Sequence, residues 1–176
     1  VLSKYWQASP ITGIFNFDGS SPSRKVIEEM TERLRHRGPD GRGIFLDENL
    51  ALGHRRLKIL DLTELGAQPM MTEDGTIVIS YNGEIYNFKE IREDLKKKGY
   101  SFKSRTDTEV ILYSYKEWGI DCIKKFNGMF AFALYDRKEK KLYLVRDRYG
   151  IKPLYYFKDE KKLLFASEIK AFLDHP

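Results

Sequence analysis

Short apolar runs of strand-forming residues fill the first and last thirds of this chain, and their distribution constrains the fold more than any other feature. The runs are rich in β-branched and aromatic residues and are bounded by turn residues such as Asp-Gly, which predicts strands. The predicted strands lie at residues 11–17, 43–46, 50–57, 76–81, 129–135, 142–145, 154–157 and 163–166. Helical periodicity follows Ser21, Asn87 and Thr106, each expected to be an N-cap, and returns near the C-terminal end. This order predicts an α+β fold of two antiparallel sheets with helices packed outside them.

Length and hydropathy fit one globular domain. A chain of 176 residues covers about 70% of its unfolded surface on folding, which is enough for a substantial core. No apolar run approaches the ~20 residues that a membrane span needs. Residues 1–10 also lack the basic start and apolar centre of a secretory signal. We therefore expect a cytoplasmic protein with no membrane partner.

Cysteine, histidine and charge argue against several kinds of site. With one cysteine, Cys122, and three histidines, we expect neither a disulfide framework nor a metal site. Cys122 is interpreted as a buried structural residue in a short helix. The net charge of +5 comes from lysines and arginines spread over the whole chain, and the densest runs fall at an expected helix end and hairpin tip. They are interpreted as solvated surface, and no nucleic-acid partner is expected because no nucleic-acid motif accompanies them.

The strand predicted at residues 76–81 runs directly into Asn82 and Gly83. An Asn side-chain amide and the N–H of a Gly can together direct two donors at one oxygen just beyond a strand end. That pair would form an oxyanion hole, the group of donors that stabilises a negatively charged oxygen during acyl transfer. Asn-Gly is also the commonest hairpin-turn dipeptide, so the pair alone leaves both interpretations open.

Five motifs in a fixed order distinguish the chain from a generic α+β domain. They are RHRGPDG at 35–41, GHRRL at 53–57, NGEIYN at 82–87, FNGMFAFA at 126–133 and RDRYGIKPLYY at 146–156. In this order they resemble the glutamine-hydrolysing half of asparagine synthetases, which is a class II glutamine amidotransferase domain. The resemblance covers the chain from about Ile11 to its end. It implies the fold of the N-terminal-nucleophile (Ntn) hydrolases, a four-layer αββα sandwich of two antiparallel sheets between helices.

The resemblance also implies roles for individual residues, and hydrolysis of a side-chain amide needs groups of these kinds. Thr12 falls at the nucleophile position, and Asn82 and Gly83 match the oxyanion hole. The substrate-binding residues that match are Arg56 for the α-carboxylate of glutamine, and Glu84 and Asp107 for its α-ammonium. Asp107 also fits the first turn of a helix, where the helix dipole favours a carboxylate. We expect these six residues to converge on one cavity of amino-acid size.

The chain departs from the family at the nucleophile. The family has an N-terminal Cys whose free amine serves as base, whereas Thr12 stands before Gly13-Ile14 here and residues 1–11 precede it as a leader. A threonine hydroxyl depends strongly on an adjacent base, and an amine within a peptide bond cannot act as one. The sequence thus predicts a glutaminase domain at residues 12–176 in which turnover is impaired.

Partners and cofactors follow from the resemblance. Glutamine is the expected ligand, and the ammonia released from it would be used by a C-terminal synthetase domain that amidates aspartate with ATP and Mg²⁺. That domain is absent here, since no Ser-Gly-Gly-rich pyrophosphate loop occurs, and no cofactor is expected in residues 12–176. The alternative is a non-catalytic pseudo-glutaminase that binds glutamine or has only a structural role, as in relatives that close β-lactam rings.

Overall fold

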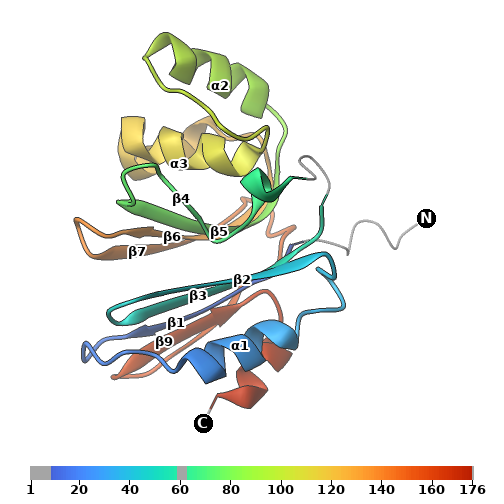
Figure 1. Ribbon diagram of the computed structural model, residues 1–176, viewed down its shortest axis with the longest axis vertical. Helices are drawn as coiled ribbons and strands as arrows, with labels where there is room; N and C mark the ends of the chain where they lie inside the picture. The colour runs from blue at the N-terminus through green and yellow to red at the C-terminus, as the bar shows by residue number, and fades with distance from the viewer. Residues whose placement is uncertain (1–8, 59–62, 176) are drawn as a thin grey trace.

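The structure is a computed structural model that describes residues 9–58 and 63–175. Two facing sheets lie between helical layers (Figure 1). The strands are β1 (Ile11–Asn16), β2 (Gly41–Asp47), β3 (Leu50–Arg56), β4 (Met70–Met71), β5 (Ile77–Ile85), β6 (Gly128–Asp136), β7 (Lys141–Arg146), β8 (Tyr155–Lys158) and β9 (Lys162–Ala166). The helices are α1 (Arg24–Glu32), α2 (Phe88–Lys97) and α3 (Asp107–Trp118), with 3-10 helices η2 (Glu64–Gly66), η3 (Gly119–Lys125) and η4 (Ile169–Asp174).

The first sheet has the strand order β2-β3-β1-β9-β8, and every neighbouring pair is antiparallel. Because side chains alternate along a strand, its two faces carry different residues. Ile14 and Ala51 pack against α1, whereas Ile11, Leu50 and Leu52 pack toward the second sheet. Alternate side chains of β1 therefore pack against α1 and against the second sheet.

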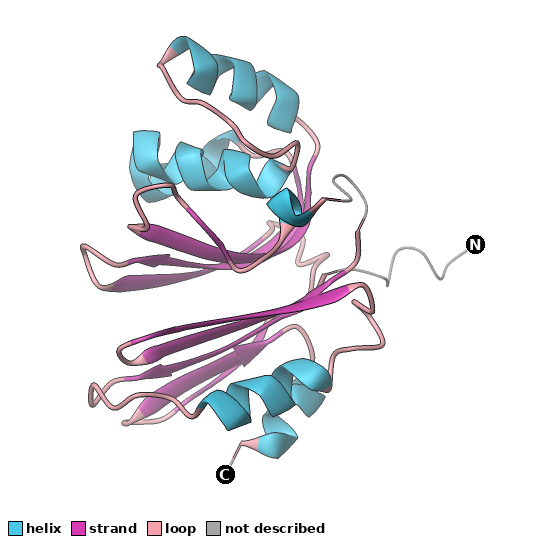
Figure 2. Cartoon of the chain, viewed as in Figure 1, coloured by secondary structure: helices cyan, strands magenta, loops and turns pink. Residues whose placement is uncertain are grey.

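The second sheet has the order β4-β5-β6-β7 and is also antiparallel. Its outer face is covered by α3, with α2 lying beyond α3 (Figure 2). Ile79, Phe132 and Leu134 form a buried cluster with Val110 and Ile111 of α3. No helix of the described chain is long and apolar enough to cross a membrane.

The predicted fold is confirmed. Two antiparallel sheets face each other through a core that includes Ile11, Leu52, Val78 and Tyr135, with α1 outside one sheet and α2 and α3 outside the other. This is the αββα arrangement that the sequence predicts. Of the leader predicted at residues 1–11, residues 1–8 lie outside the described chain.

The end of the central strand differs from the prediction. β5 does not stop before Asn82; it continues to Ile85, and each of its residues pairs with β6, from Ile77 opposite Asp136 to Ile85 opposite Gly128. The hairpin-turn interpretation of Asn-Gly is therefore wrong.

Two helix starts also differ from the prediction. Ser23, rather than Ser21, is the N-cap of α1, and its hydroxyl accepts a hydrogen bond from Val26 N. The Asn87 side chain does not cap α2, because it bonds instead to the backbone of Lys125 and Asn127.

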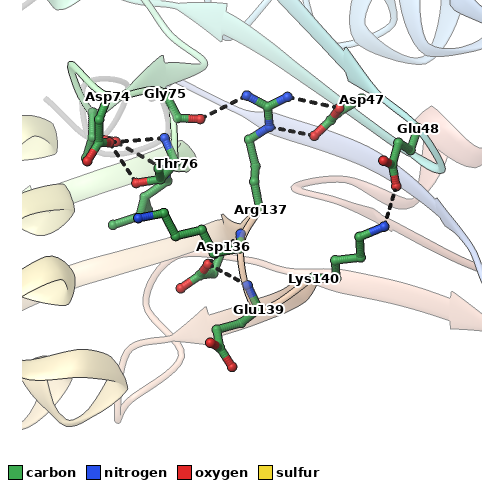
Figure 3. Close-up of polar contacts among 12 residues, drawn as sticks. Asp47, Glu48, Asp74, Gly75, Thr76, Asp136, Arg137, Glu139 and Lys140 are labelled. Atoms are coloured by element: carbon green, nitrogen blue, oxygen red, sulfur yellow. Dashed lines mark hydrogen bonds and ion pairs between the residues drawn. The ribbon is translucent and has the colours of Figure 1, made fainter.

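A polar clamp joins the end of β2 in the first sheet to the residues that follow β6 in the second (Figure 3). Arg137, beyond β6, extends between two loops: its Nε and Nη2 donate to Asp47 at 2.7 and 3.2 Å, and its Nη1 donates to Gly75 O at 2.9 Å. Lys140 pairs with Glu48 at 3.0 Å. Such partly exposed ion pairs contribute about 1 kcal/mol or less each. They connect the end of β2 in the first sheet with the residues that follow β6 in the second.

Candidate functional site

Asn82 is a buried amide whose polar atoms bond to no described residue. Its side chain is fully buried, and neither Nδ2 nor Oδ1 has a hydrogen-bond partner in the described chain. Two positions earlier on the same face of β5, the Ser80 hydroxyl donates to Gly53 O in the first sheet at 3.1 Å, which places this face between the sheets. A buried polar group without a partner costs about 1–3 kcal/mol, so this amide is an expected place for a ligand or an ordered water.

Gly83 offers a second donor on the open edge of β5. Alternate N–H groups of a strand point to the same side. The N–H groups of Tyr81 and Ile85 point away from β6, because they donate to Gln68 Oε1 at 2.7 Å and to Asp107 Oδ2 at 2.9 Å. The Gly83 N–H between them points to the same edge. A Cβ at this position would overlap Met129 O and the backbone of Phe130, so the close pairing with β6 requires glycine.

Asp107, the first residue of α3, lies at that same edge. Its Oδ2 accepts hydrogen bonds from the Tyr81 hydroxyl at 2.6 Å and from Ile85 N. The Asp107 side chain is almost fully buried, and this burial raises the pKa of its carboxyl. The negative charge of Glu84 raises the pKa as well, whereas the two hydrogen bonds lower it. A cation bound beside Asp107 and Glu84 would offset the cost of their negative charge.

Lys152 is a charged neighbour that the sequence analysis missed. Only 5% of its surface is exposed, and burial lowers the pKa of its ammonium while the nearby Glu84 raises it and Arg37 lowers it further.

Arg56 faces the second sheet from the end of β3. It shares its face with His54, whose Nε2 lies 3.3 Å from the carbonyl oxygen of Tyr81 in β5. Arg56 is buried, with 6% of its surface exposed. The structure therefore brings Arg56, Asn82, Gly83, Glu84 and Asp107 to the same end of the two sheets.

Thr12 is not among them. It precedes Ile14 on the face of β1 that packs against α1, and its hydroxyl lies 2.9 Å from that of Thr31, which itself donates to Ile27 O. A Cβ on Gly53 would overlap both threonine hydroxyls, so Thr12 and Thr31 fill the space between sheet and helix. The Thr12 side chain is fully buried there, and it does not face the Asn82 amide.

Ser9 is the hydroxyl that the sequence analysis missed at the start of β1. Its Oγ accepts a hydrogen bond from Leu57 N at 3.1 Å and lies 3.4 Å from Leu57 O, next to Arg56.

In the described chain, neither Cys122 nor a group of acidic and histidine residues forms a second candidate catalytic or metal site. Cys122 is buried as predicted, and burial raises the pKa of its thiol to about 12, so it is not a reactive thiolate. Within the described ranges, no three His, Cys, Asp or Glu side chains are grouped so that they could hold a metal ion.

The groups at this end of the sheets differ in what each could bind. Two neutral donors at Asn82 and Gly83 suit a carbonyl oxygen that gains negative charge. Two carboxylates suit an ammonium group, and a guanidinium suits a carboxylate. An α-amino acid with a carbonyl in its side chain carries all three partners.

Comparisons with known proteins show the family of the chain. The family model described as "Glutamine amidotransferase domain" matches residues 9–176, a range that begins at Ser9. The chain is 43% identical over 169 residues to "Asparagine synthetase [glutamine-hydrolyzing] 3" of Bacillus subtilis, covering 94% of this chain and 27% of that protein. It is 44% identical over 158 residues to the Arabidopsis thaliana protein of the same name, covering 89% and 27%.

A solved structure shares the fold at low sequence identity. It is the glutamine phosphoribosylpyrophosphate amidotransferase of B. subtilis, with a TM-score of 0.78, 21% identity, and coverage of 93% of this chain and 42% of that one. The chain thus spans about a quarter of the length of the two sequence relatives and less than half of the structural one.

Proposed function

The chain belongs to the glutamine amidotransferase domain family, and on that premise we propose that it binds glutamine as the nitrogen donor of a glutamine-dependent asparagine synthetase. The proposed reaction at this site is hydrolysis of the glutamine side-chain amide to glutamate and ammonia. Amidation of aspartate with that ammonia would belong to a C-terminal synthetase domain, consistent with relatives much longer than this chain.

The observation that carries this proposal is the buried Asn82 amide without a described partner, next to a Gly83 N–H directed at the open edge of β5. In the proposed complex, the Asn82 Nδ2 and the Gly83 N–H donate to the side-chain carbonyl oxygen of glutamine. Attack on that carbonyl makes the oxygen negative, and the two donors stabilise it in a site shielded from water.

The amino-acid end of glutamine would be held by charge. Arg56 would bind the α-carboxylate with two parallel N–H donors. Asp107 and Glu84 would bind the α-ammonium, and the bound cation would lower the raised pKa of Asp107. These contacts fix the distance between the ammonium and the carbonyl, so asparagine, one methylene shorter, would not reach the donors.

The site lacks a well-activated nucleophile, and this is what should limit its turnover of glutamine. Family chemistry uses an N-terminal Cys with its own amine as base, whereas Thr12 is buried against α1 and Ser9 is the hydroxyl near Arg56. A serine or threonine hydroxyl without an adjacent base reacts slowly. We therefore propose glutamine binding with little hydrolysis by the chain in this form.

Calorimetry with glutamine, asparagine and glutamate, together with an assay of glutamate release, tests the proposal. We expect glutamine to bind, asparagine to bind at least about tenfold more weakly because it lacks the donor contacts, and Asn82→Leu to lose the preference. Equal affinity for glutamine and asparagine would contradict the assignment of Asn82 and Gly83.

A second candidate function is a domain that has only a structural role. The burial of the Thr12 hydroxyl against Thr31 favours it, since the predicted nucleophile then does not face Asn82. Absence of glutamine binding by the unmodified chain would support this candidate over the first.

A further inference from the structure

Three N–H groups line the open edge of β5 beyond the short strand β4. β4 pairs only with Val78 and Ile79, and past these residues no described strand continues along this edge. The N–H groups on the edge are those of Tyr81, Gly83 and Ile85. The first and third donate to side chains, and the middle one is the proposed oxyanion donor. Its direction therefore depends on the groups that hold its two neighbours.

Gln68 holds the first of them. Its Oε1 accepts the Tyr81 N–H at 2.7 Å, and its Nε2 donates to Thr108 Oγ1 at 3.3 Å. Thr108 follows Asp107 in the first turn of α3, and Asp107 holds the Ile85 N–H. Gln68 thus connects the strand to the helix whose first residue holds the other end of the edge.

His54 holds the same residue from the opposite sheet. A carbonyl oxygen can only accept, so the contact of 3.3 Å to Tyr81 O requires a proton on Nε2. Burial, together with the charges of Arg56 and Arg55, lowers the pKa of His54 to about 3 although the hydrogen bond to Tyr81 O raises it, so the ring remains neutral. Its Nδ1 has no hydrogen-bond partner among described residues. The Tyr81 carbonyl belongs to the peptide plane that ends at the Asn82 nitrogen, so His54 holds that plane from the opposite sheet in addition to the pairing of Asn82 with Ala131 of β6.

We infer that Gln68 and His54 are positioning residues, which hold the two backbone groups of Tyr81 and thereby direct the Asn82 amide and the Gly83 N–H at the substrate carbonyl. This inference rests on the proposed function. Neither residue need touch glutamine, because both act through the backbone of β5. Their loss should weaken the donor contacts while the charged contacts to the amino-acid end remain.

NMR of the full chain with glutamine tests the inference. Signals of the Gly83 N–H and the Asn82 side-chain amide are expected to shift on glutamine addition. In Gln68→Met and His54→Met these shifts should fall by at least about half, while the glutamine Kd changes less than about threefold, because the charged contacts supply most ground-state affinity. His54→Gln keeps a donor near the position of Nε2 and should restore the response.

Tyr115→Phe is the matched control. Tyr115 lies in α3, and its hydroxyl donates to Asp136 at 3.0 Å, a bond that this variant removes. Asp136 is the last residue of β6 and pairs with Ile77, at the other end of β5 from Ile85. The variant should leave both shifts as in the unmodified chain. Unchanged shifts in Gln68→Met and His54→Met with glutamine bound would overturn the inference, as would a failure of His54→Gln to restore them.

Amide hydrogen exchange separates this inference from the proposed function. Without glutamine, the Tyr81 N–H should exchange about tenfold faster in Gln68→Met, because it loses its acceptor, the Gln68 Oε1. Unchanged exchange there overturns the positioning role whether or not glutamine binds. Absence of glutamine binding by the unmodified chain counts against the proposed function instead.

Discussion

The hydroxyl of Tyr81 donates to Oδ2 of Asp107 at 2.6 Å, and the same oxygen accepts the Ile85 N–H at 2.9 Å. One carboxylate oxygen thus joins residues on both sides of Asn82 and Gly83. Burial, and then the charge of Asp107, keep the pKa of Tyr81 well above its ordinary value, so the hydroxyl remains a donor. Asp107 therefore has a structural role, through the hydrogen bonds to its Oδ2, and a proposed role in binding the glutamine ammonium, through its charge.

These two parts can be separated at Asp107. In Asp107→Asn, the amide oxygen can accept both hydrogen bonds but carries no charge, so we expect the free energy of unfolding to change by about 1 kcal/mol or less. Glutamine affinity should fall about tenfold or more, since the ammonium loses a charged partner. Urea unfolding and calorimetry measure the two quantities.

Asp107→Ala is the control for the structural part. It leaves the buried Tyr81 hydroxyl and the Ile85 N–H without an acceptor, and we expect it to lower the unfolding free energy by about 2 kcal/mol or more. If Asp107→Asn destabilises as much as Asp107→Ala, or leaves glutamine affinity unchanged, this division of roles is wrong.

Asn82→Leu should raise stability and remove function. The side chains are similar in size, and the change removes two buried polar atoms that lack described partners, so we expect a gain of about 1 kcal/mol in unfolding free energy. A variant competent for hydrolysis should lose about 100- to 1,000-fold in kcat, the usual effect of removing one oxyanion donor. Thermal unfolding and glutamate release are the measurements.

Ser114→Ala is matched to that change. Ser114 lies in α3, is fully buried, and its Oγ also lacks a partner among the described residues. This variant should leave glutamine hydrolysis unchanged. A loss of stability in Asn82→Leu would mean that the amide has partners within the folded chain, which is the opposite of what we expect.

The pH dependence of stability should report on His54. Its pKa is about 3 in the folded chain against an ordinary value of 6.5, so between these values the unfolded state binds more protons. The stability that neutral His54 supports is therefore complete above about pH 6.5 and is lost as the pH falls toward 3. We expect unfolding free energies at pH 7, 6 and 5 to fall more steeply for the unmodified chain than for His54→Gln, by up to about 1.4 kcal/mol per pH unit. Parallel pH curves would show that His54 is accessible to protons when folded.

Strand alternation and helical periodicity predicted the layers of the fold, because the burial of apolar faces determines both patterns. They did not predict where β5 ends. The end of this strand depends on its pairing with β6, whose residues are more than forty positions away in the sequence. Local turn propensity at Asn82-Gly83 was outweighed by that long-range pairing.

The site was predicted in part, through motif resemblance rather than spacing. Asn82, Gly83 and Glu84 lie together because they are consecutive, and Asp107 joins them through α3. Thr12 was predicted as the nucleophile position because it precedes Gly13-Ile14, but its side chain faces α1, as the alternation of β1 requires. Gln68, His54 and Lys152 were missed because their contacts come from other strands and loops, which no local pattern records.

The start of β1 provides the last prediction. Family chemistry requires a cysteine with a free amine, and the structure distinguishes two places for it. In a chain that begins at residue 9 with Ser9→Cys, the thiol would lie beside Leu57 and Arg56, and Pro10 O would still accept from Arg55 N at 3.0 Å. We expect this chain to release glutamate, because it would have both a thiol and a free amine at a position next to Leu57 and Arg56.

A chain that begins at residue 12 with Thr12→Cys tests the other place. Its thiol would lie against Thr31, and the hydrogen bonds of Pro10 and of Ile11 N with Ser167 Oγ would be lost. We expect no measurable glutamate release from it, and little from the unmodified chain, whose serine and threonine hydroxyls lack an amine base. A chain beginning at residue 9 that keeps serine should be intermediate, since it regains the amine without the thiol. Higher activity in the chain that begins at residue 12 would restore Thr12 as the nucleophile position. It would also mean that the residue 12 side chain turns from α1 toward the second sheet when glutamine binds.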